Sequence, residues 1–365
     1  MNTLTSLAPA AELSEEQQEC ERRIQDFLID PYPAKPYFSV QGLAGCGKSW
    51  LLAKIARQMG GRGLMGAFTG KAASVLSRRT GLEASTIHSA IYQFERESWN
   101  DQGKRELEFS AKVENGSWRK RTFLLDESSM VPESLALDLI ATGVKLITAG
   151  DPGQLQPVNG VPFFRDADFT LQEVRRQAWD SPIIRQAHRM RHEGQYGPDG
   201  ADFRVERFVD RDDLLAADIL LCWRNTTRRM LNDLVRAHRQ MPVGYADAGE
   251  PVMALKNNHT QALLNGAIYT LRQPHRPGGA ICVINERGDP VEIEGWVEGL
   301  EDGRDQDRWS IPFAFAYAAT VHKSQGSSWP RIIVVDEYDQ TEQRREWVYT
   351  ALTRAEKSVI VQRNW

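Results

Sequence analysis

Residues 42–49 read GLAGCGKS: a glycine, four residues, and then Gly47, Lys48 and Ser49. Backbone amides of such a loop point inward and bind phosphate oxygens, helped by the N-terminus of the helix that follows. The lysine ammonium neutralises the β- and γ-phosphates, and the serine hydroxyl is a Mg²⁺ ligand. The run therefore predicts a bound nucleoside triphosphate, without indicating what its hydrolysis drives.

An acidic pair, Asp126-Glu127, ends the apolar run TFLL. An aspartate at the end of a buried strand can hold Mg²⁺, and an adjacent glutamate can polarise the attacking water. Acids that merely cap a helix are the alternative, but LLDESSM stands about where an ATPase with this loop needs its carboxylates. With Lys48 and Ser49, the pair predicts ATP hydrolysis that uses Mg²⁺.

Hydrolysis also needs positive charge on the transferred phosphoryl group, which an arginine usually supplies. Arg176 in LQEVRRQ and Arg354 in YTALTRA are the candidates. Each arginine alone is more typical of a surface position or an ion pair than of a catalytic site. If Arg354 belongs to a second lobe, ATP would bind between two lobes, and hydrolysis would open and close the cleft.

Alternating strands and helices must position these side chains. Residues 13–29 have helical periodicity with Ser14 as the N-cap, PYFSVQG predicts a buried strand, and KSWLLAKIARQM predicts the helix after the loop. LMGAFTG, RTFLLDESSM and GVKLITAGDPGQL each read as a strand that ends in polar residues. This alternation predicts a parallel sheet with right-handed crossovers, and ligands bind such sheets at the carboxyl ends of the strands.

Two stretches interrupt the alternation. Residues 89–121 are polar and aromatic with turn signals, which predicts a small β-hairpin insertion. Residues 270–316 contain short β-like runs separated by Gly, Pro and Asp, which predicts a small all-β insertion. Because strand–helix patterns resume around the second insertion, we expect an α/β protein with two domains, at 1–190 and 191–365.

Composition excludes several classes of protein. The 365 residues are 41% hydrophobic and 26% charged, which is typical of a globular protein, and no run of about 20 apolar residues could cross a bilayer. The N-terminus does not read as a secretory signal, and four scattered cysteines indicate reduced thiols rather than a metal cluster. A net charge of −4 argues against a passive basic coat for nucleic acid but permits a local basic groove. We expect a cytoplasmic protein.

Eight motifs in order give the chain a specific resemblance: GLAGCGKS, TGKAASVL, STIH, LLDESSM, GDPGQLQPV, LQEVRRQ, TVHKSQG and YTALTRA. The series resembles a superfamily 1B helicase of the RecD-like and Dda-like branch, whose members typically move 5′ to 3′ on single-stranded DNA. The matches extend from about residue 13 to residue 360. The resemblance implies two RecA-like domains with parallel sheets, a strand-separating pin at about 89–121 and an SH3-like insertion at about 270–316.

The resemblance also implies roles at the nucleotide site. Gln17 would read the adenine, Asp126 would share Mg²⁺ with Ser49, and Gln154 would sense the γ-phosphate and couple it to the DNA groove. Arg176 and Arg354 would contact the γ-phosphate. The remaining residues placed around ATP are Gly42, Ala44, Gly45, Cys46, Gly47, Lys48, Ser49, Gln325 and Gly326.

Other motifs resemble the track for the single strand. Short hydroxyl, amide and cationic side chains suit it because contacts to phosphate give affinity without reading sequence. The residues expected there are Phe68, Thr69, Lys71, Thr86, His88, Asn225, Thr320, His322 and Lys323. Phe68, Trp118 or Trp223 could stack on bases, although packing in the core or in the pin is an alternative of at least equal weight for each of them.

The sequence departs from the family at two points, since Cys46 replaces a common threonine and Phe68 replaces a proline. Neither change removes a required functional group. We expect an ATP-dependent DNA helicase, acting as a monomer on single strands and junctions in a bacterial or phage-infected cell, with a single-strand binding protein or a replication or recombination complex as further partners. A translocase without strong unwinding, an RNA helicase, and a nucleotide-dependent binding subunit of a recombination or nuclease complex are the alternatives.

Overall fold

The structure, a computed structural model, describes residues 13–99, 105–111, 120–156, 162–174, 180–258, 261, 263–285, 288–300, 311–337 and 343–363, without the side chains of 93–99 and 105–111. The chain divides into two compact units, and neither is one continuous stretch. Unit 1 takes Met1–Gly66, Ile87–Pro152 and Pro157–Arg175, and unit 2 takes Ala67–Thr86, Gly153–Gln156 and Arg176–Trp365. The domain boundaries expected from the sequence stay predictions.

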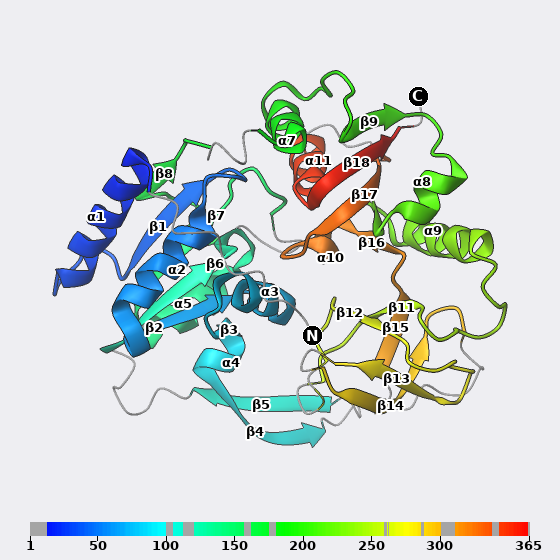
Figure 1. Ribbon diagram of the computed structural model, residues 1–365. Helices are drawn as coiled ribbons and strands as arrows, with labels where there is room; N and C mark the ends of the chain where they lie inside the picture. Colours follow the sequence, from blue (N-terminus) through cyan, green and yellow to red (C-terminus); the bar gives the residue numbers. More distant parts are fainter. Residues whose placement is uncertain are drawn as a thin grey trace. The chain divides into compact units, whose positions relative to one another are not determined.

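A mostly parallel sheet organises the first half of the chain (Figure 1). Its order is β3-β2-β6-β7-β1-β8, and β1 pairs in parallel with both β7 and β8. The strands are β1 Tyr37–Gly42, β2 Gly63–Ala67, β3 Ala84–Thr86, β6 Thr122–Asp126, β7 Lys145–Gly150 and β8 Phe169–Leu171. The phosphate loop follows β1 and the acidic pair ends β6, so both predicted motifs stand at carboxyl ends of parallel strands.

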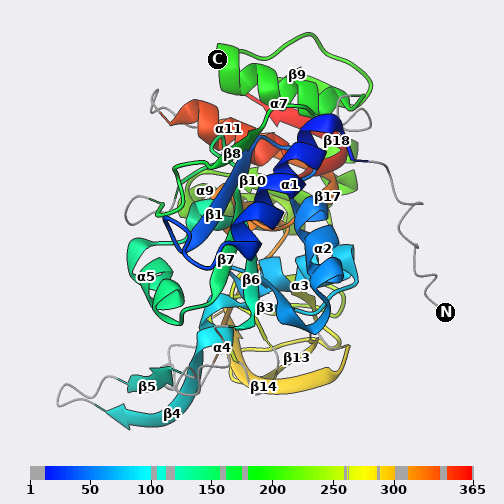
Figure 2. The same ribbon diagram turned by 90° about the vertical axis from the view of Figure 1, so that its left-hand side faces the viewer.

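Helices cover both faces of this sheet. Figure 2 shows α2 Lys48–Met59 on one face and α5 Glu133–Ala141 on the other. The chain runs from β1 to β2 in one direction along the sheet and from β6 to β7 in the other, so right-handed connections place the two helices on opposite faces. Helix α1 Glu15–Ile29 has the N-cap expected at Ser14, whose hydroxyl accepts from the Gln17 amide at 3.3 Å, and the Gln17 side chain completes a capping box. None of the described helices is long and apolar enough to cross a bilayer.

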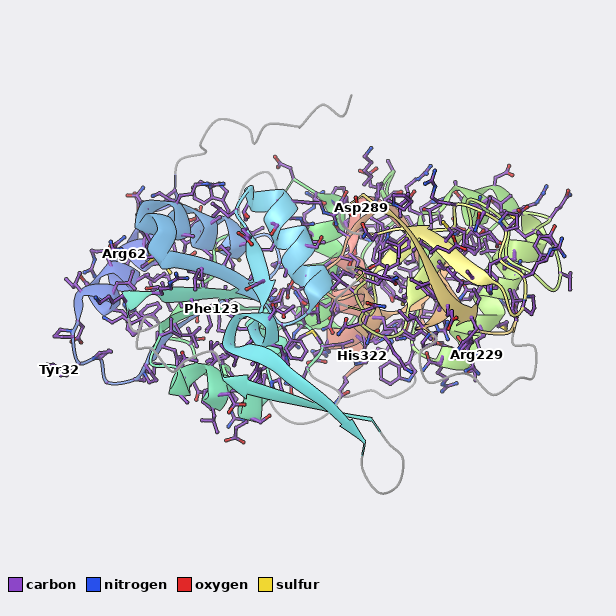
Figure 3. The ribbon with its side chains drawn as sticks, turned by 90° about the horizontal axis from the view of Figure 1, so that it is seen from below. Tyr32, Arg62, Phe123, Arg229, Asp289 and His322 are labelled. Atoms are coloured by element: carbon purple, nitrogen blue, oxygen red, sulfur yellow. The ribbon has the colours of Figure 1, made fainter. Side chains whose placement is uncertain are left out.

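Close packing fixes the middle of the sheet. Phe123 of β6, labelled in Figure 3, is fully buried, and a Cβ built on Gly66 of β2 would lie only 2.2 Å from its ring. A side chain at residue 66 would therefore have to displace the Phe123 ring, because a filled core does not accept extra atoms without displacement.

The hairpin expected within residues 89–121 is present. Helix α4 Ile87–Ile91 leads into β4 Tyr92–Trp99, which pairs antiparallel with β5 Arg105–Ala111. Figure 2 shows this hairpin projecting away from the sheet of unit 1. At its base the Tyr92 hydroxyl donates to the Asp138 carboxylate of α5. The residues between β5 and Lys120 lie outside the described part of the chain.

Unit 2 is built on a second, entirely parallel sheet of order β16-β10-β17-β18-β9. Figure 1 shows α7 and α11 on one side of this sheet and α8 and α9 on the other. The strands are β9 Phe203–Glu206, β10 Ile219–Cys222, β16 Ala318–Thr320, β17 Trp329–Val335 and β18 Ala355–Gln362. The helices are α3 Gly70–Thr80, α7 Pro182–Glu193, α8 Arg211–Ala216, α9 Asn225–His238, α10 Val321–Ser324 and α11 Arg344–Leu352.

The small β insertion is also present, as a five-stranded sheet of order β12-β11-β15-β14-β13. Its strands are β11 Pro251–Ala254, β12 Ile268–Thr270, β13 Ala280–Ile284, β14 Pro290–Val297 and β15 Ile311–Phe315. β11 precedes the range expected from the sequence, and β12 begins two residues before that range. The four-residue run of β11 carries little strand signal by itself. One hydrophobic cluster contains Leu220 of β10, Val252 of β11 and Phe313 of β15, so the two sheets of unit 2 share a core.

Candidate nucleotide and nucleic-acid binding sites

The phosphate loop has the backbone that its glycines allow. Gly45 and Gly47 have φ of 92° and 78°, a left-handed region that glycine reaches without steric cost, and Gly47 is the N-cap of α2. Gly42 is required for a different reason, because a Cβ there would lie 2.9 Å from the Leu171 carbonyl oxygen of β8. The loop between these glycines, including Ala44, leads directly into the N-terminus of α2, where anions are stabilised.

The two central side chains of the loop differ in their environment. Lys48 Nζ donates to the carbonyl oxygens of Gly42 at 2.6 Å and Leu43 at 3.0 Å, so its ammonium is held over the loop that would receive phosphates. Cys46 is buried, and burial raises the pKa of its thiol, which keeps the sulfur protonated. The cysteine therefore acts as a small core residue, in agreement with the interpretation of Cys46 as a tolerated variation.

Gln17 joins helix α1 to this loop. Its side chain is 1% exposed, its Nε2 donates to the Cys46 carbonyl oxygen at 2.9 Å, and its Oε1 accepts from the Ser14 amide at 3.3 Å. The same residue thus closes the capping box and fixes the loop backbone. Whether Gln17 also reads adenine stays a prediction.

The acidic pair lies at the carboxyl edge of the same sheet. Asp126 is 8% exposed, and Glu127 has φ of 54°, a left-handed conformation that is uncommon for a residue with a side chain. A Cβ built on Gly150 would lie 2.9 Å from oxygens of Gln41, Ser128 and Ser129. The ends of β1, β6 and β7 therefore converge at Gly150, next to both motifs, and the strained backbone at Glu127 is of a kind that concentrates at functional sites.

The donors present here suit Mg²⁺ held together with a nucleotide. Ser49 and Asp126 offer hard oxygen atoms, which this ion prefers. In the part of the chain that the structure describes, no group of three or more His, Cys, Asp or Glu side chains could hold a metal by itself. Phosphate oxygens and water would have to complete the coordination, as is usual for Mg²⁺ in nucleotide sites.

Unit 2 brings together Gln325 and Arg354, two predicted nucleotide contacts, around the loop that carries Gln154. Gln325 Nε2 donates to the Leu155 carbonyl oxygen at 3.1 Å, and the Leu155 amide donates to the Thr350 hydroxyl of α11 at 2.8 Å. The Arg354 guanidinium is buried and donates to the carbonyl oxygens of Thr350 and Ser327 at 3.1 and 3.4 Å. The segment 153–156 is thereby attached to both motifs of unit 2.

Gly326 is also required by its surroundings. It has φ of 74°, and a Cβ there would lie 2.7 Å from Cβ of Ala72 in helix α3. Ala72 belongs to the first turn of α3, whose N-cap Thr69 accepts from the Ala72 amide at 3.2 Å. Lys71 of the same turn donates to the Gly266 carbonyl oxygen at 3.0 Å and lies 5.1 Å from the Trp329 ring centre.

A second group of predicted strand contacts gathers where β10 and β16 end. Cys222 and Thr320 are register partners, so the chain turns into α9 and α10 at neighbouring points. The rings of Trp223 and His322 lie 5.3 Å apart, and burial lowers the pKa of His322. Burial, followed by the charge of Arg228, lowers the pKa of Lys323, the next residue. Asn225 is exposed at the first position of α9.

A carboxylate that none of the predicted motifs includes holds this end of α9. Glu337, the second residue after β17, accepts from the backbone amides of Trp223 and Arg224 at 2.8 Å each and from the Thr227 hydroxyl. Its signal was visible, since Asp336-Glu337 ends the apolar run IIVV just as Asp126-Glu127 ends TFLL.

The remaining predicted residues are located here by their position and burial. Phe68 and Thr86 are half-buried in the segment that carries α3 and β3, and His88 is exposed on α4. Arg176 and Trp118 lie outside the described residues. Their expected roles stay predictions.

Comparison with known proteins identifies the family. A model described as an AAA domain matches residues 25–208, just over half of the chain, and one described as a UvrD-like helicase C-terminal domain matches residues 315–362. The ATP-dependent RecD2 DNA helicase of Deinococcus radiodurans is 28% identical over 367 residues, which cover 91% of this chain and 47% of that protein. The chain thus spans about half the length of this relative.

Two further proteins extend the comparison. The ATP-dependent DNA helicase dda of Enterobacteria phage T4 is 32% identical over 167 residues, covering 41% of this chain and 36% of that protein. The Pif1 helicase from Bacteroides, solved with ADP-AlF3 and single-stranded DNA, has the same fold, with a TM-score of 0.60 and 20% identity over 96% of this chain and 92% of that one. The chain belongs to the AAA-domain family and, within it, to the superfamily 1B helicases of the RecD and Dda type.

Proposed function

We propose that this chain is an ATP-driven motor that moves 5′ to 3′ along single-stranded DNA and unwinds duplex where the β4–β5 hairpin meets a junction. Its membership of the superfamily 1B helicases supports the reaction class, and the hairpin and the small β insertion match the elements expected for it. The direction follows the RecD-like and Dda-like branch.

The observation that carries the proposal is the segment from Thr320 to Gly326. Its first half holds expected contacts to the strand, at Thr320, His322 and Lys323, and its second half holds expected contacts to the nucleotide, at Gln325 and Gly326. Only the short helix α10 separates the two groups. Gln325 Nε2 donates to the carbonyl oxygen of Leu155, the residue after Gln154. A displacement of Gln154 on binding of ATP would therefore be passed through Gln325 to α10 and its expected strand contacts.

The roles of the side chains follow from their chemistry. Lys48 would exchange the carbonyl oxygens of Gly42 and Leu43 for phosphate oxygens, and Ser49 with Asp126 would hold Mg²⁺, which neutralises charge on the phosphates. Glu127 would orient and deprotonate the attacking water. Arg354 would stabilise the negative charge that develops on the γ-phosphoryl group, for which it must leave its carbonyl partners.

The test measures ATP hydrolysis without nucleic acid, with single-stranded DNA and with single-stranded RNA. We expect strong stimulation by DNA only, and loss of this activity in Lys48→Ala. Lys54→Ala is the matched control, since Lys54 lies on the same helix and pairs with Glu21 at 2.6 Å, away from the loop. Retained turnover in Lys48→Ala refutes the site, and equal stimulation by RNA refutes the preference for DNA.

Direction is tested with duplexes that carry either a 5′ or a 3′ single-stranded tail. Unwinding only from the 5′ tail supports the proposed polarity, and preference for the 3′ tail overturns it. ATP hydrolysis stimulated by DNA, but without unwinding of either duplex, would indicate a translocase in place of a helicase.

A further inference from the structure

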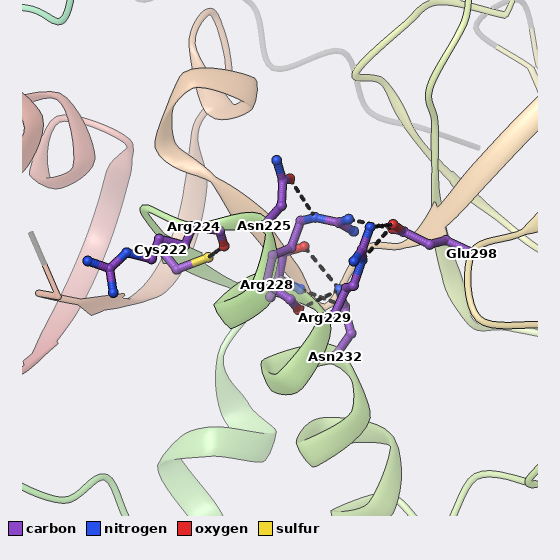
Figure 4. A network of polar contacts seen from close by, with 8 residues as sticks. Cys222, Arg224, Asn225, Arg228, Arg229, Asn232 and Glu298 are labelled. Carbon is purple, nitrogen blue, oxygen red and sulfur yellow. Dashed lines mark hydrogen bonds and ion pairs between the residues drawn. The ribbon is translucent and has the colours of Figure 1, made fainter.

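The first half of helix α9 carries a cluster of charged residues that none of the helicase motifs includes. Glu298, in the loop after β14, binds two consecutive arginines of α9 (Figure 4). Its Oε2 accepts from Arg228, and its Oε1 accepts from Arg229 Nε at 2.7 Å. Burial raises the pKa of Glu298, but the bonds and charges of the two arginines outweigh this effect and leave the pKa below its usual value. Glu298 is therefore a carboxylate at neutral pH.

The two arginines differ in access to a ligand. The Arg228 side chain is 4% exposed, whereas the Arg229 side chain is 59% exposed. Arg228 is also held from its other side, because its Nε donates to Asn225 Oδ1 at 3.3 Å. Arg228 is thus a fixed structural partner, and Arg229 is the cation that a phosphate could reach.

This cluster continues the expected strand contacts. Asn225, bonded to Arg228, is one of them, and the charges of Arg228 and Glu298 both act on the pKa of Lys323, which is another. Figure 3 labels Arg229 of this cluster and His322, the neighbour of Lys323; like Asn225 and Glu298, both residues belong to unit 2. A strand that contacts Asn225 and Lys323 would therefore pass close to the Arg228–Glu298 pair.

A cavity of about 450 Å³ opens beside the cluster. Arg228, Arg229, Trp296 and Glu298 line it together with Phe315 and Asp233. An aromatic ring next to a guanidinium can hold one nucleotide, with the base on the ring and the phosphate on the cation. The two carboxylates balance the two arginines, so the cavity carries no net charge and would not attract phosphate strongly.

We propose that this cavity is a further binding site for one nucleotide of single-stranded DNA, in which Arg229 takes the phosphate, Trp296 stacks on the base, and Glu298 competes with the phosphate for Arg229. The proposal rests on the proposed function. A weakened contact of this kind suits a motor, because each step must release the strand as well as hold it.

The test measures the affinity for fluorescein-labelled oligo(dT) by anisotropy at several NaCl concentrations, without nucleotide. In Glu298→Gln we expect tighter binding, with a slope of log K against log[NaCl] that is steeper by about 0.7, the value for one further phosphate contact on a single strand. In Arg229→Gln we expect weaker binding and a slope shallower by about 0.7. The Arg229 variant leaves the buried Arg228–Glu298 pair in place, so its result stands even if Glu298→Gln does not fold.

The control variants are Arg331→Gln and Asp218→Asn. These two residues form another ion pair of unit 2, between β17 and the residue before β10, and the Arg331 side chain is 54% exposed, similar to that of Arg229. Their slopes should equal that of the wild type. Trp296→Ala should weaken binding to oligo(dT) about tenfold but leave the affinity for an abasic strand unchanged. Slopes in Glu298→Gln and Arg229→Gln that equal those of the controls overturn the inference, whereas a wild type that fails to bind oligo(dT) overturns the proposed function instead.

Discussion

Replacing Glu337 tests how one carboxylate positions the end of helix α9. It accepts three hydrogen bonds from this end, two from backbone amides and one from the Thr227 hydroxyl. Removing a helix N-cap costs about 1 kcal/mol, and hydrogen bonds to a charged group are each worth about 1.5–3 kcal/mol. Because Glu337 is only half-buried, we take the lower values and expect Glu337→Ala to destabilise this end of α9 by about 2 kcal/mol.

The assay follows local opening rather than global unfolding, because a chain with two units need not unfold in one step. Hydrogen exchange with mass spectrometry of a peptide over Trp223 and Arg224 should become about 30-fold faster in Glu337→Ala, and less so in Glu337→Gln, whose carbonyl oxygen still accepts. Affinity for oligo(dT) should fall in the same order, because Trp223 and Asn225 lose their fixed positions.

Asp218→Ala provides the matched control. Asp218 stands at the other end of β10 and also accepts from a backbone amide, that of Arg331 at 2.8 Å. Its removal should leave the exchange of the Trp223 peptide and the affinity for DNA unchanged. Unaltered exchange in Glu337→Ala would refute the stabilising role of the carboxylate. Faster exchange with unchanged affinity would refute the positioning role.

Three further perturbations test other parts of the structure. Gly66→Ala should lower the free energy of unfolding, measured in urea, by about 1–3 kcal/mol, because the new Cβ would press on the Phe123 ring. Gly61→Ala is the control, since a Cβ there has no other atom within 4 Å, and it should leave the stability unchanged. Equal stability of the two variants would contradict the packing argument. Gln17→Ala should raise the KM for ATP about tenfold with little change in kcat, because one buried hydrogen bond to the phosphate loop is lost; an unchanged KM argues against this role. Burial lowers the pKa of His322 below 6.5, so near and below this pH the unfolded chain binds more protons than the folded protein. The free energy of unfolding should therefore decrease as the pH falls from 6.5 towards the pKa of the folded state. His322→Gln should flatten this decrease in urea titrations.

Much of the fold followed from local patterns. The predicted elements include the strand, loop and helix around Lys48, the N-cap at Ser14, the hairpin after α4 and the small β insertion. Turn residues and periodicity act over a few residues, so local sequence is enough to indicate them. The order of strands in either sheet did not follow, since pairing depends on contacts between distant segments. β11 was missed for a related reason, because four apolar residues become a strand only when β12 and β15 pair with them.

For the candidate sites, the sequence by itself determined the chemistry of the groups, and the tertiary structure decided which groups act together. GLAGCGKS and LLDESSM specify a phosphate loop and an acidic pair because glycine conformations and the ends of strands are local properties. Glu337 accepts from the Trp223 amide, 114 positions away in the sequence. Glu298 pairs with Arg228 and Arg229, which lie 70 and 69 positions away. No local pattern encodes such pairs, since they exist only where folding brings a loop of one element to the end of another.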